Sequence, residues 1–572
     1  MPIIKLTGYT GELPKVIPRL LNANAAQIAQ NCRLEDGSLT PIRQPRAVAT
    51  VEGTAGQIKT IYKHKDTWYA WESEVNAAPG PVADDRLYYT GDGKPKMRIG
   101  DTIYDLAVPY PTSALTGTVQ GEVDTKNITT LLYVYTWVTE YGEESEASPV
   151  SNEVDWSPGL DISLSGFQPV PDGRGITRQR IYRSQSSLQH GTALYFIAER
   201  DATAENYLDP VGLNDISEPL PSPPYSPPPD TMAGLTALPN GMLAAFNGKQ
   251  LLFCEPYILH AWPEAYILTT DYNIVALGAF GNTIIVATEG TPYIVSGTHP
   301  SNMVMEKLEL NLPCINSRGV VDLGYSVAYP SNDGLVLVDT SGAKVVSDSV
   351  MTRDQWKQLG PGSLVAGQVG GRYFASYAFV DKNSVPRLGS FLMDVTGEIP
   401  FMISTSHQSE ACFYDITTGS LYILKGTTIY EWDNPTAMPE YFDWKSKEFV
   451  LPAPTNFGAI MIEGEENSDT LANIITYNEQ YINLPSIGGE FSGSALNEYD
   501  LNGDMLLSSG IALSFQATIY ADKEQVALVS KQNTMVRLPS GFLARIWEIE
   551  IVGNLRISDV VMAGTGAEMR RA

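Results

Sequence analysis

The sequence predicts an all-β protein, and three observations lead to that prediction. Residues 278–356 alternate short β-branched or aromatic runs, such as residues 284–287, with turns rich in Gly, Asn, Asp and Pro. We include residues 352–356 (TRDQW) in this alternation of strand and turn. The same spacing runs through most of the 572 residues, and 49 glycines and 38 prolines are enough to supply many turns. Four-stranded sheets arranged radially, as in a β-propeller, need such spacing.

Residues 1–108 predict an N-terminal arm followed by the first part of the propeller. Residues 24–32 (NAAQIAQNC) form a helix candidate between Pro-rich flanks. Residues 61–71 (IYKHKDTWYAW) then alternate large apolar and polar side chains, and residues 86–90 (RLYYT) run into the turn GDGKP. This alternation is typical of half-buried strands. We therefore expect one blade's worth of strands in this part.

Residues 109–230 predict an inserted sandwich of the immunoglobulin or fibronectin type. The strands here are longer, and the period of two places Tyr133, Tyr135 and Trp137 on one face. About seven strand-sized segments without a pair of cysteines favour a fibronectin-like module. The Pro-rich stretch at residues 219–230 is expected to close the module as a stiff, extended linker.

The last two regions complete the predicted architecture. Residues 231–450 return to short strands, so we assign them to the remainder of the propeller. Residues 451–572 contain strands at the wider spacing of a β-sandwich and are assigned to a separate C-terminal β domain. The expected fold is a β-propeller interrupted by an immunoglobulin-like sandwich, plus a C-terminal sandwich-like domain.

Composition excludes some classes of function. The chain has 38 Lys and Arg against 65 Asp and Glu, a net charge of −27. Tight binding to nucleic acid depends on clustered cations, so a general grip on DNA is not expected. An acidic surface can equally keep a large β protein soluble.

The cysteines and the apolar stretches also set limits. Cys32, Cys254, Cys314 and Cys412 lie far apart without a C-x-x-C pair, so we expect buried thiols and neither a zinc site nor a disulfide framework. The N-terminal residues lack the apolar core of a signal peptide, and the apolar stretch at 266–288 is interrupted by polar residues. Synthesis in a cytosol and no membrane span are expected.

Three short motifs resemble functional signatures but depart from them. Residues 500–504 (DLNGD) begin like a calcium loop, yet Met505 stands where glycine is needed and Ile511 where glutamate is needed. Residues 331–334 (SNDG) resemble the Asp-box of sialidases with the glycine one place early. Residues 339–342 (DTSG) have one residue too many for an aspartic protease, and no second copy follows. We therefore reject a calcium site at residues 500–504 and interpret the other two motifs as plain turns.

No catalytic constellation is apparent from the remaining side chains. The histidines are scattered and share no metal-ligand or triad spacing: His64, His190, His260, His299 and His407. Two acidic clusters flank turn glycines and are interpreted as solvated hairpin tips: Glu140, Glu143 and Glu144, then Glu463, Glu465 and Glu466. Four aromatics could stack sugars but are expected to pack between sheets: Trp68, Trp71, Tyr88 and Tyr89. The sequence predicts no enzyme, no cofactor and no metal.

Several phrases along the chain together resemble one family, the tail nozzle or tail hub proteins of short-tailed bacteriophages, which are related to packaged-DNA stabilisation proteins. The phrases are NAAQIAQNCRLEDGSLTPIRQP, RLYYTGDGKPKM, YVYTWVTEYGEESEASPVS with RIYRS, GLTALPNGMLAAFNGKQLLFCEPYILHAWP, LGAFGNTIIVATEGTPYIVSG, TRDQW and RIWEIEIVGN. They fall in all the expected domains in order, although none is a catalytic signature.

The resemblance implies a structural virion protein assembled in the bacterial host cytoplasm. It implies a homohexameric ring at the distal part of the tail, a head-to-tail adaptor above it, and tail fibre or tail plug proteins beside it. Viral DNA would pass through the channel without specific binding. The sequence does not identify the residues of a channel gate or of a ring interface.

Two other functions fit an all-β chain of this kind. A glycan-binding or glycan-degrading propeller of the tail would use the aromatic strands, and paired acids if it were an enzyme. A fibre-attachment adaptor would have no role in the channel.

Overall fold

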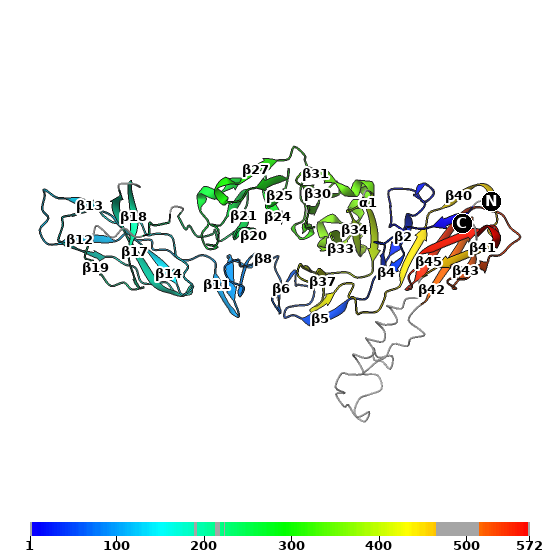
Figure 1. Ribbon diagram of the computed structural model, residues 1–572, viewed down its shortest axis with the longest axis horizontal. Coiled ribbons are helices and arrows are strands. Elements are labelled where there is room, and N and C mark those ends of the chain that lie inside the picture. The colour runs from blue at the N-terminus through cyan, green and yellow to red at the C-terminus, as the bar shows by residue number, and fades with distance from the viewer. Residues whose placement is uncertain are drawn as a thin grey trace, which may run out of the picture. The chain divides into compact units, whose positions relative to one another are not determined.

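The computed structural model shows an all-β protein. It describes residues 3–187, 191–211, 218–221, 224–397, 399–464 and 514–569. Two compact units divide the chain: Ser73–Pro313 forms one, and Met1–Glu72 with Cys314–Ala572 forms the other. Each unit contains both propeller blades and a β-sandwich (Figure 1).

The unit of Ser73–Pro313 contains three blades, each a four-stranded antiparallel sheet. The first consists of β8 (Asn76–Pro79), β9 (Arg86–Thr90), β10 (Lys96–Ile99) and β11 (Thr102–Asp105). The second consists of β20 (Ala233–Leu238), β21 (Met242–Asn247), β22 (Gln250–Phe253) and β23 (Leu268–Thr269). The third consists of β24 (Ile274–Phe280), β25 (Thr283–Thr288), β26 (Tyr293–Ser296) and β27 (Val304–Lys307). The first strand β20 lies beside β8 and β24, so the first strands are innermost, as in a propeller.

The predicted sandwich is inserted between the first two of these blades. Its sheets consist of β12 (Thr116–Gln120), β16 (Asp161–Ser165) and β19 (Tyr207–Asp209); β13 (Thr129–Leu131) and β15 (Val154–Trp156); and β14 (Tyr133–Thr139), β17 (Ile176–Ser187) and β18 (Gly191–Asp201). Tyr133, Tyr135 and Trp137 lie in one buried cluster together with Trp156. The alternation therefore predicted correctly which face of β14 supplies the core.

The other unit contains four further blade sheets. They consist of β28 (Val321–Asp322), β29 (Val327–Pro330), β30 (Leu335–Asp339) and β31 (Gly342–Val345); β32 (Val365–Val369), β33 (Arg372–Val380), β34 (Pro386–Asp394) and β35 (Phe401–Thr405); β36 (Cys412–Asp415), β37 (Ser420–Lys425), β38 (Thr428–Glu431) and β5 (Arg46–Thr50); and β6 (Thr60–His64) with β7 (Thr67–Trp71). The first strands again follow one another, in the order β28, β32, β36, β6. Strand β5 comes from the N-terminal part of the chain, whereas β36 to β38 lie after residue 410. Their shared sheet therefore pairs the beginning of the propeller sequence with its end.

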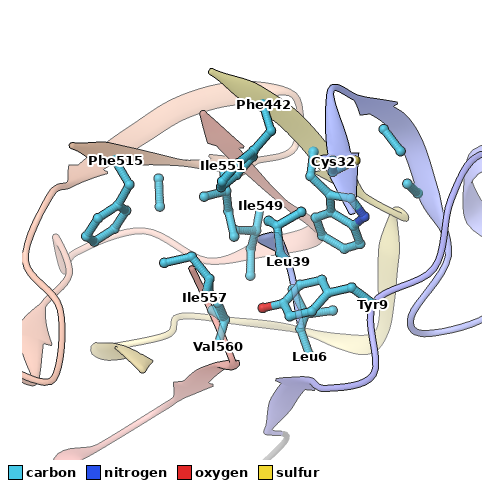
Figure 2. Close-up of a cluster of buried hydrophobic side chains, with 14 of the residues drawn as sticks. Leu6, Tyr9, Cys32, Leu39, Phe442, Phe515, Ile549, Ile551, Ile557 and Val560 are labelled. Carbon is cyan, nitrogen blue, oxygen red and sulfur yellow. The ribbon is translucent and has the colours of Figure 1, made fainter. Parts of the chain in front are cut away.

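The second sandwich is built from both ends of the chain. One layer contains β1 (Ile4–Leu6), β46 (Asp559–Ala563), β41 (Ala459–Glu463) and β44 (Val536–Arg537). The other contains β2 (Ala26–Gln30), β39 (Phe442–Ser446), β45 (Ala544–Gly553), β42 (Phe515–Ala521) and β43 (Glu524–Val529), with β40 (Phe449–Thr455) paired to β45. Figure 2 shows side chains from both ends pointing into one core, among them Leu6, Tyr9, Ile549 and Val560. We refer to this body as the terminal sandwich.

One sheet continues from a blade into the terminal sandwich. The last strand of the second blade of this unit, β35, pairs in parallel with β2 through Ser404 and Gln30. Beside them, Glu12 bridges both Met402 and Ala26. The resulting sheet has ten strands, so the blade and the sandwich share one backbone hydrogen-bond ladder. No local pattern in the sequence indicates this continuity.

The helix expected at residues 24–32 is wrong. This segment forms β2 and, after Asn31, β3 (Cys32–Arg33), which pairs with β4 (Thr40–Pro41). Ala26 and Ala29 are buried, and β2 pairs with β39 along one edge. Alanine has a high helix propensity, but propensity is a weak preference that burial between strands overrides.

The strand and turn expected at residues 352–356 are also wrong. Thr352 caps the short helix α1 (Arg353–Gln358), and Gln355 completes the capping box by accepting from the Thr352 N–H at 2.7 Å. The other described helical segments are α3 (Gly566–Met569) and the 3₁₀ turns η1 (Pro18–Leu20), η2 (Glu264–Tyr266), η3 (Pro300–Asn302), η4 (Ser317–Gly319), η5 (Val346–Ser349) and η6 (Pro361–Ser363). Among the described helices, none has the length and apolar character needed to cross a membrane.

Candidate functional sites

A cleft of about 770 Å³ lies where the innermost strands of the four-blade unit begin. Lys59 precedes β6, Glu410 lies just before β36, and Arg318 belongs to η4 before β28. Lys425 and Glu72 also line it, so cations and acids are mixed. Neighbouring strands of a blade run in opposite directions, so the start of the first strand and the end of the second lie at the same end of the sheet. These residues therefore line one end of the blades.

The polar groups of this cleft hold the backbone in place. Arg318 Nη2 donates to the carbonyl of Lys59 at 2.9 Å and also to that of Glu410. Asn316 Nδ2 donates to the Leu364 carbonyl, directly before β32, at 2.6 Å. Residues 316–318 therefore tie together the beginnings of four innermost strands. Ser409 Oγ donates to the Ala411 carbonyl at 2.6 Å, which makes it another support of the backbone and not a nucleophile beside a base.

A second cluster joins the inserted sandwich to the neighbouring blades. Glu143 pairs with Arg174 at 2.7 Å and approaches Arg86 of β9 at 4.0 Å. The guanidinium groups lie over aromatic rings: Arg86 over Tyr141 and Arg174 over Tyr104 of β11. Ion pairs and contacts between guanidinium groups and aromatic rings link the inserted sandwich to the blade here. We call this cluster of Arg86, Tyr104, Tyr141, Glu143 and Arg174 the charge junction.

Glu144 and His260 extend the charge junction. The Glu144 carboxylate accepts from Thr136 and from Tyr182, both at 2.6 Å, and pairs with Arg180 at 2.8 Å. Its backbone carbonyl lies 2.7 Å from Nε2 of His260, in the loop after β22. Burial lowers the pKa of His260, whereas the negative charges of Glu143 and Glu144 act in the opposite direction.

The prediction of solvated hairpin tips is therefore wrong for Glu143 and Glu144, which are buried. Sequence alone shows acids beside a turn glycine, but their arginine partners come from segments 31 to 57 residues away. Glu140 is exposed, and Glu463 is half-buried in β41. Glu465 and Glu466 lie outside the described residues, as do Asp500, Asn502 and Asp504.

The two other motifs form turns, as predicted. Ser331 N donates to the Gly334 carbonyl at 2.9 Å between β29 and β30, and Trp356 Nε1 donates to the Ser331 carbonyl at 2.8 Å. Asp339 accepts from Ser341 N at 2.7 Å between β30 and β31.

The histidines and cysteines do not gather into a centre among the described residues. Those residues contain no group of three or more His, Cys, Asp or Glu that could hold a metal ion. His299 caps η3, while His407 lies 3.0 Å from Glu440. His64 lies in β6, and His190 is not described. All the cysteines are free; Cys32, Cys254 and Cys314 are buried as expected, whereas Cys412 is partly exposed.

Four aromatic residues could stack sugars, although the sequence favours their packing between sheets. Trp68 packs edge-on against Phe413 and Tyr422 of the adjoining blade, with ring centroids 5.6 and 5.0 Å apart. Tyr88 and Tyr89 are buried in β9. Packing between neighbouring sheets, the interpretation favoured from the sequence, is confirmed for Trp68 and Tyr88.

Two half-buried acids lie where the blade sheet meets the terminal sandwich. Glu12 accepts from Ala29 N at 2.8 Å and from Ser404 Oγ at 3.2 Å. Burial raises the pKa of Glu12 to about 7, and it raises the pKa of Asp443 on β39 to about 6. Nothing in the sequence marks these acids, because Glu12 stands alone in a loop and Asp443 alternates with core aromatics.

Comparison with known proteins identifies no family. No protein-family model and no curated protein matches the chain. Among solved structures, PorZ, a surface component of the type-IX secretion system of Porphyromonas gingivalis, has 10% identity and a TM-score of 0.21; the match covers 69% of this chain and 44% of PorZ. YCF48 from Cyanidioschyzon merolae has 9% identity and a TM-score of 0.19, with 69% and 99% covered. The extracellular domain of BT4673 from B. thetaiotaomicron has 8% identity and a TM-score of 0.22, with 92% and 62% covered. Similarities with such low TM-scores support no inference about this chain.

Proposed function

We propose that this chain is a structural virion protein that forms the nozzle or hub ring at the distal part of a short phage tail. Its role is to line and close the channel through which DNA is ejected. The observation that carries the proposal is the continuous ten-stranded sheet, which supports it by joining a blade and the terminal sandwich through backbone hydrogen bonds. The phrases shared with tail nozzle proteins in every part of the chain point to the same role.

The physical demands on such a ring agree with this architecture. A wall around pressurised DNA must resist deformation, and the backbone hydrogen bonds where β35 meets β2 and Glu12 resist separation of the blade from the sandwich. A net charge of −27 disfavours the phosphate contacts that would hold DNA in the channel. A cyclic ring lets one chain line the whole conduit.

The proposal includes the partners and the location. The copies form a homohexameric ring in the virion tail, the head-to-tail adaptor binds above it, and fibre or plug proteins dock beside or below it. Assembly takes place in the host cytoplasm. DNA passes without specific binding, and no reaction is catalysed.

The glycan-binding alternative, motivated by the propeller together with its aromatic strands, loses support from two of those aromatic residues. Trp68 and Tyr88 pack between neighbouring sheets and are not displayed as a stacking surface. We therefore do not carry that function further.

Native mass measurement and negative-stain images of the purified full chain, alone and with tail extract, test the proposal. We expect a ring-shaped oligomer in at least one of the two conditions. A chain that stays single in both would overturn the nozzle assignment.

A further inference from the structure

The N-terminal part of the chain leaves the terminal sandwich after β1 and returns to it at β2, and residues 9–15 lie between these strands. Their first half is bonded to the sandwich. The Tyr9 N–H donates to the Gly37 carbonyl at 2.9 Å. The Thr10 carbonyl accepts from Trp444 Nε1 at 3.1 Å. We call residues 9–15 the strap.

The second half of the strap is bonded to the blades. The Glu12 N–H donates to the Met402 carbonyl of β35 at 2.8 Å, and the Met402 N–H donates back to the Glu12 carbonyl at 3.1 Å. The Lys15 N–H donates to the carbonyl of Val350, in the segment after β31, at 2.9 Å. The Lys15 side chain pairs with Asp348 at 3.1 Å. The strap therefore ties the terminal sandwich to the blade of β32 to β35 and to the segment that follows the neighbouring blade.

The carboxyl group of Glu12 lies among these contacts. Its Oε1 atom accepts from Ala29 N of β2 at 2.8 Å and from Ser404 Oγ of β35 at 3.2 Å. The side chain thus contacts a strand of the sandwich and a strand of the blade, where these two strands pair with each other. A change in its charge therefore affects the bonding of the strap on both sides.

The charged groups around Glu12 do not neutralise it. Asp443 of β39 acts on Glu12 as a second negative charge, and among the described residues no cation acts on the titration of Glu12. The Asp443 Oδ1 atom is buried without a hydrogen-bond partner in the described part of the chain. Behind it, Glu550 and Lys445 act on Asp443 with opposite signs. Cys32 also faces Glu12, but burial raises the pKa of its thiol, which stays neutral.

The closed strap holds protons that an open strap would release. Burial raises the pKa of Glu12 to about 7 and that of Asp443 to about 6, whereas carboxyls in water titrate near 4. The hydrogen bonds from Ala29 and Ser404 favour the charged form of Glu12, but burial and the charge of Asp443 outweigh them. Because the closed form binds more protons, it is most stable below about pH 4 and loses stability as the pH rises to about 7.

We propose that the strap is a pH-dependent clasp, which holds the blade against the terminal sandwich while Glu12 is protonated and opens once Glu12 and Asp443 are both charged. Opening breaks the bonds between Glu12 and Met402 and leaves the pairing of β2 with β35 to join blade and sandwich. The proposal rests on the contacts of the strap and is independent of the nozzle function.

Hydrogen exchange of the full chain, followed by mass spectrometry and corrected for the intrinsic rate at each pH, tests the proposal. We expect the protection of peptides that cover the strap to fall on the order of 50-fold between about pH 5 and about pH 8. Peptides from β45, in the core of the terminal sandwich, should keep their protection. In Glu12→Gln, which mimics the protonated side chain, the strap should stay protected across this range. Glu122→Gln, at an exposed position outside the strap, is the matched control and should follow wild type.

Two further variants separate charge from simple attachment, and circular dichroism checks that each folds. Asp443→Asn should weaken the pH dependence, because Glu12 then titrates without the opposing charge. Lys15→Met removes the exposed pair with Asp348, so it should lower protection by a similar factor at every pH and leave the pH dependence intact.

Three results would overturn the proposal. One is strap protection that does not change with pH. Another is a loss of protection that extends equally to β45, which would mean global unfolding. The third is a pH dependence that persists unchanged in Glu12→Gln or, should that variant not fold, in Asp443→Asn.

Discussion

Single residues fix the inserted sandwich on its blades through buried charge. Arg174 is 2% exposed and Glu143 8%, and they pair with each other across the charge junction. A buried ion pair adds little net stability because desolvation offsets the attraction, but an unmatched member is costly. We therefore expect the junction to determine one orientation of the sandwich more than it raises stability.

Arg174→Met is expected to lower the free energy of unfolding by about 3–5 kcal/mol, because it leaves the buried Glu143 carboxylate with a hydrogen bond from Thr139 and with Arg86, at 4.0 Å, as its cationic partner. The double change Arg174→Met with Glu143→Gln should recover much of that loss. Denaturant unfolding of the four members of this cycle measures both effects.

The exposed pair Lys94 and Asp230 provides the control, and Lys94→Met should cost less than about 1 kcal/mol. Equal losses for Arg174→Met and Lys94→Met would contradict the role given to the charge junction.

Glu12 gives a prediction about pH. Burial raises the pKa of Glu12 to about 7 in the folded chain, whereas a carboxyl in the unfolded chain titrates near 4.3. The folded state holds this proton more tightly, so stability falls as the pH rises from about 4.3 to 7 and is then constant. Glu12→Gln removes that loss and should gain about 3 kcal/mol relative to wild type across this window.

The measurement is the difference in unfolding free energy between Glu12→Gln and wild type at several pH values. Glu122→Gln, at an exposed position, is the control and should follow wild type. A difference for Glu12→Gln that stays flat across the window would show that Glu12 is not held in its neutral form.

At the scale of elements, sequence patterns predicted strands well where alternation was strong and failed where partners lay far away. Tyr133 to Trp137 alternate clearly, and their core face is confirmed. Residues 24–32 read as a helix because the alanines and glutamines favour one, yet β2 is held between β39 and Glu12. Such pairing joins segments some 400 residues apart, which no local pattern encodes.

The junction between blade and terminal sandwich depends on a small residue. A Cβ on Gly11 would lie 2.4 Å from the Met402 carbonyl and 2.5 Å from the Phe401 ring. Gly11→Ala should therefore cost about 1–3 kcal/mol through overpacking. Gly362→Ala, where a Cβ would meet nothing within 4 Å, should be close to neutral.

Thermal unfolding of these two glycine variants distinguishes them. A melting temperature lowered equally by both would mean that the contact with β35 does not constrain Gly11.

At the scale of the whole molecule, the fold class could be predicted because turn residues and short strands recur along the entire chain. The two candidate sites could not be predicted from the sequence. The charge junction and the cleft around Arg318 assemble from single residues of several segments, and Arg318 stands in no motif. The terminal sandwich likewise appears only when both ends of the chain are brought together.

The most direct test of the central claim is an electron cryo-microscopy map of phage tails that carry this chain. We predict a closed ring of copies around the tail axis, with the all-β body of each copy forming the channel wall. Density for a single copy mounted on the side of the tail, or no density on the axis, would contradict the account.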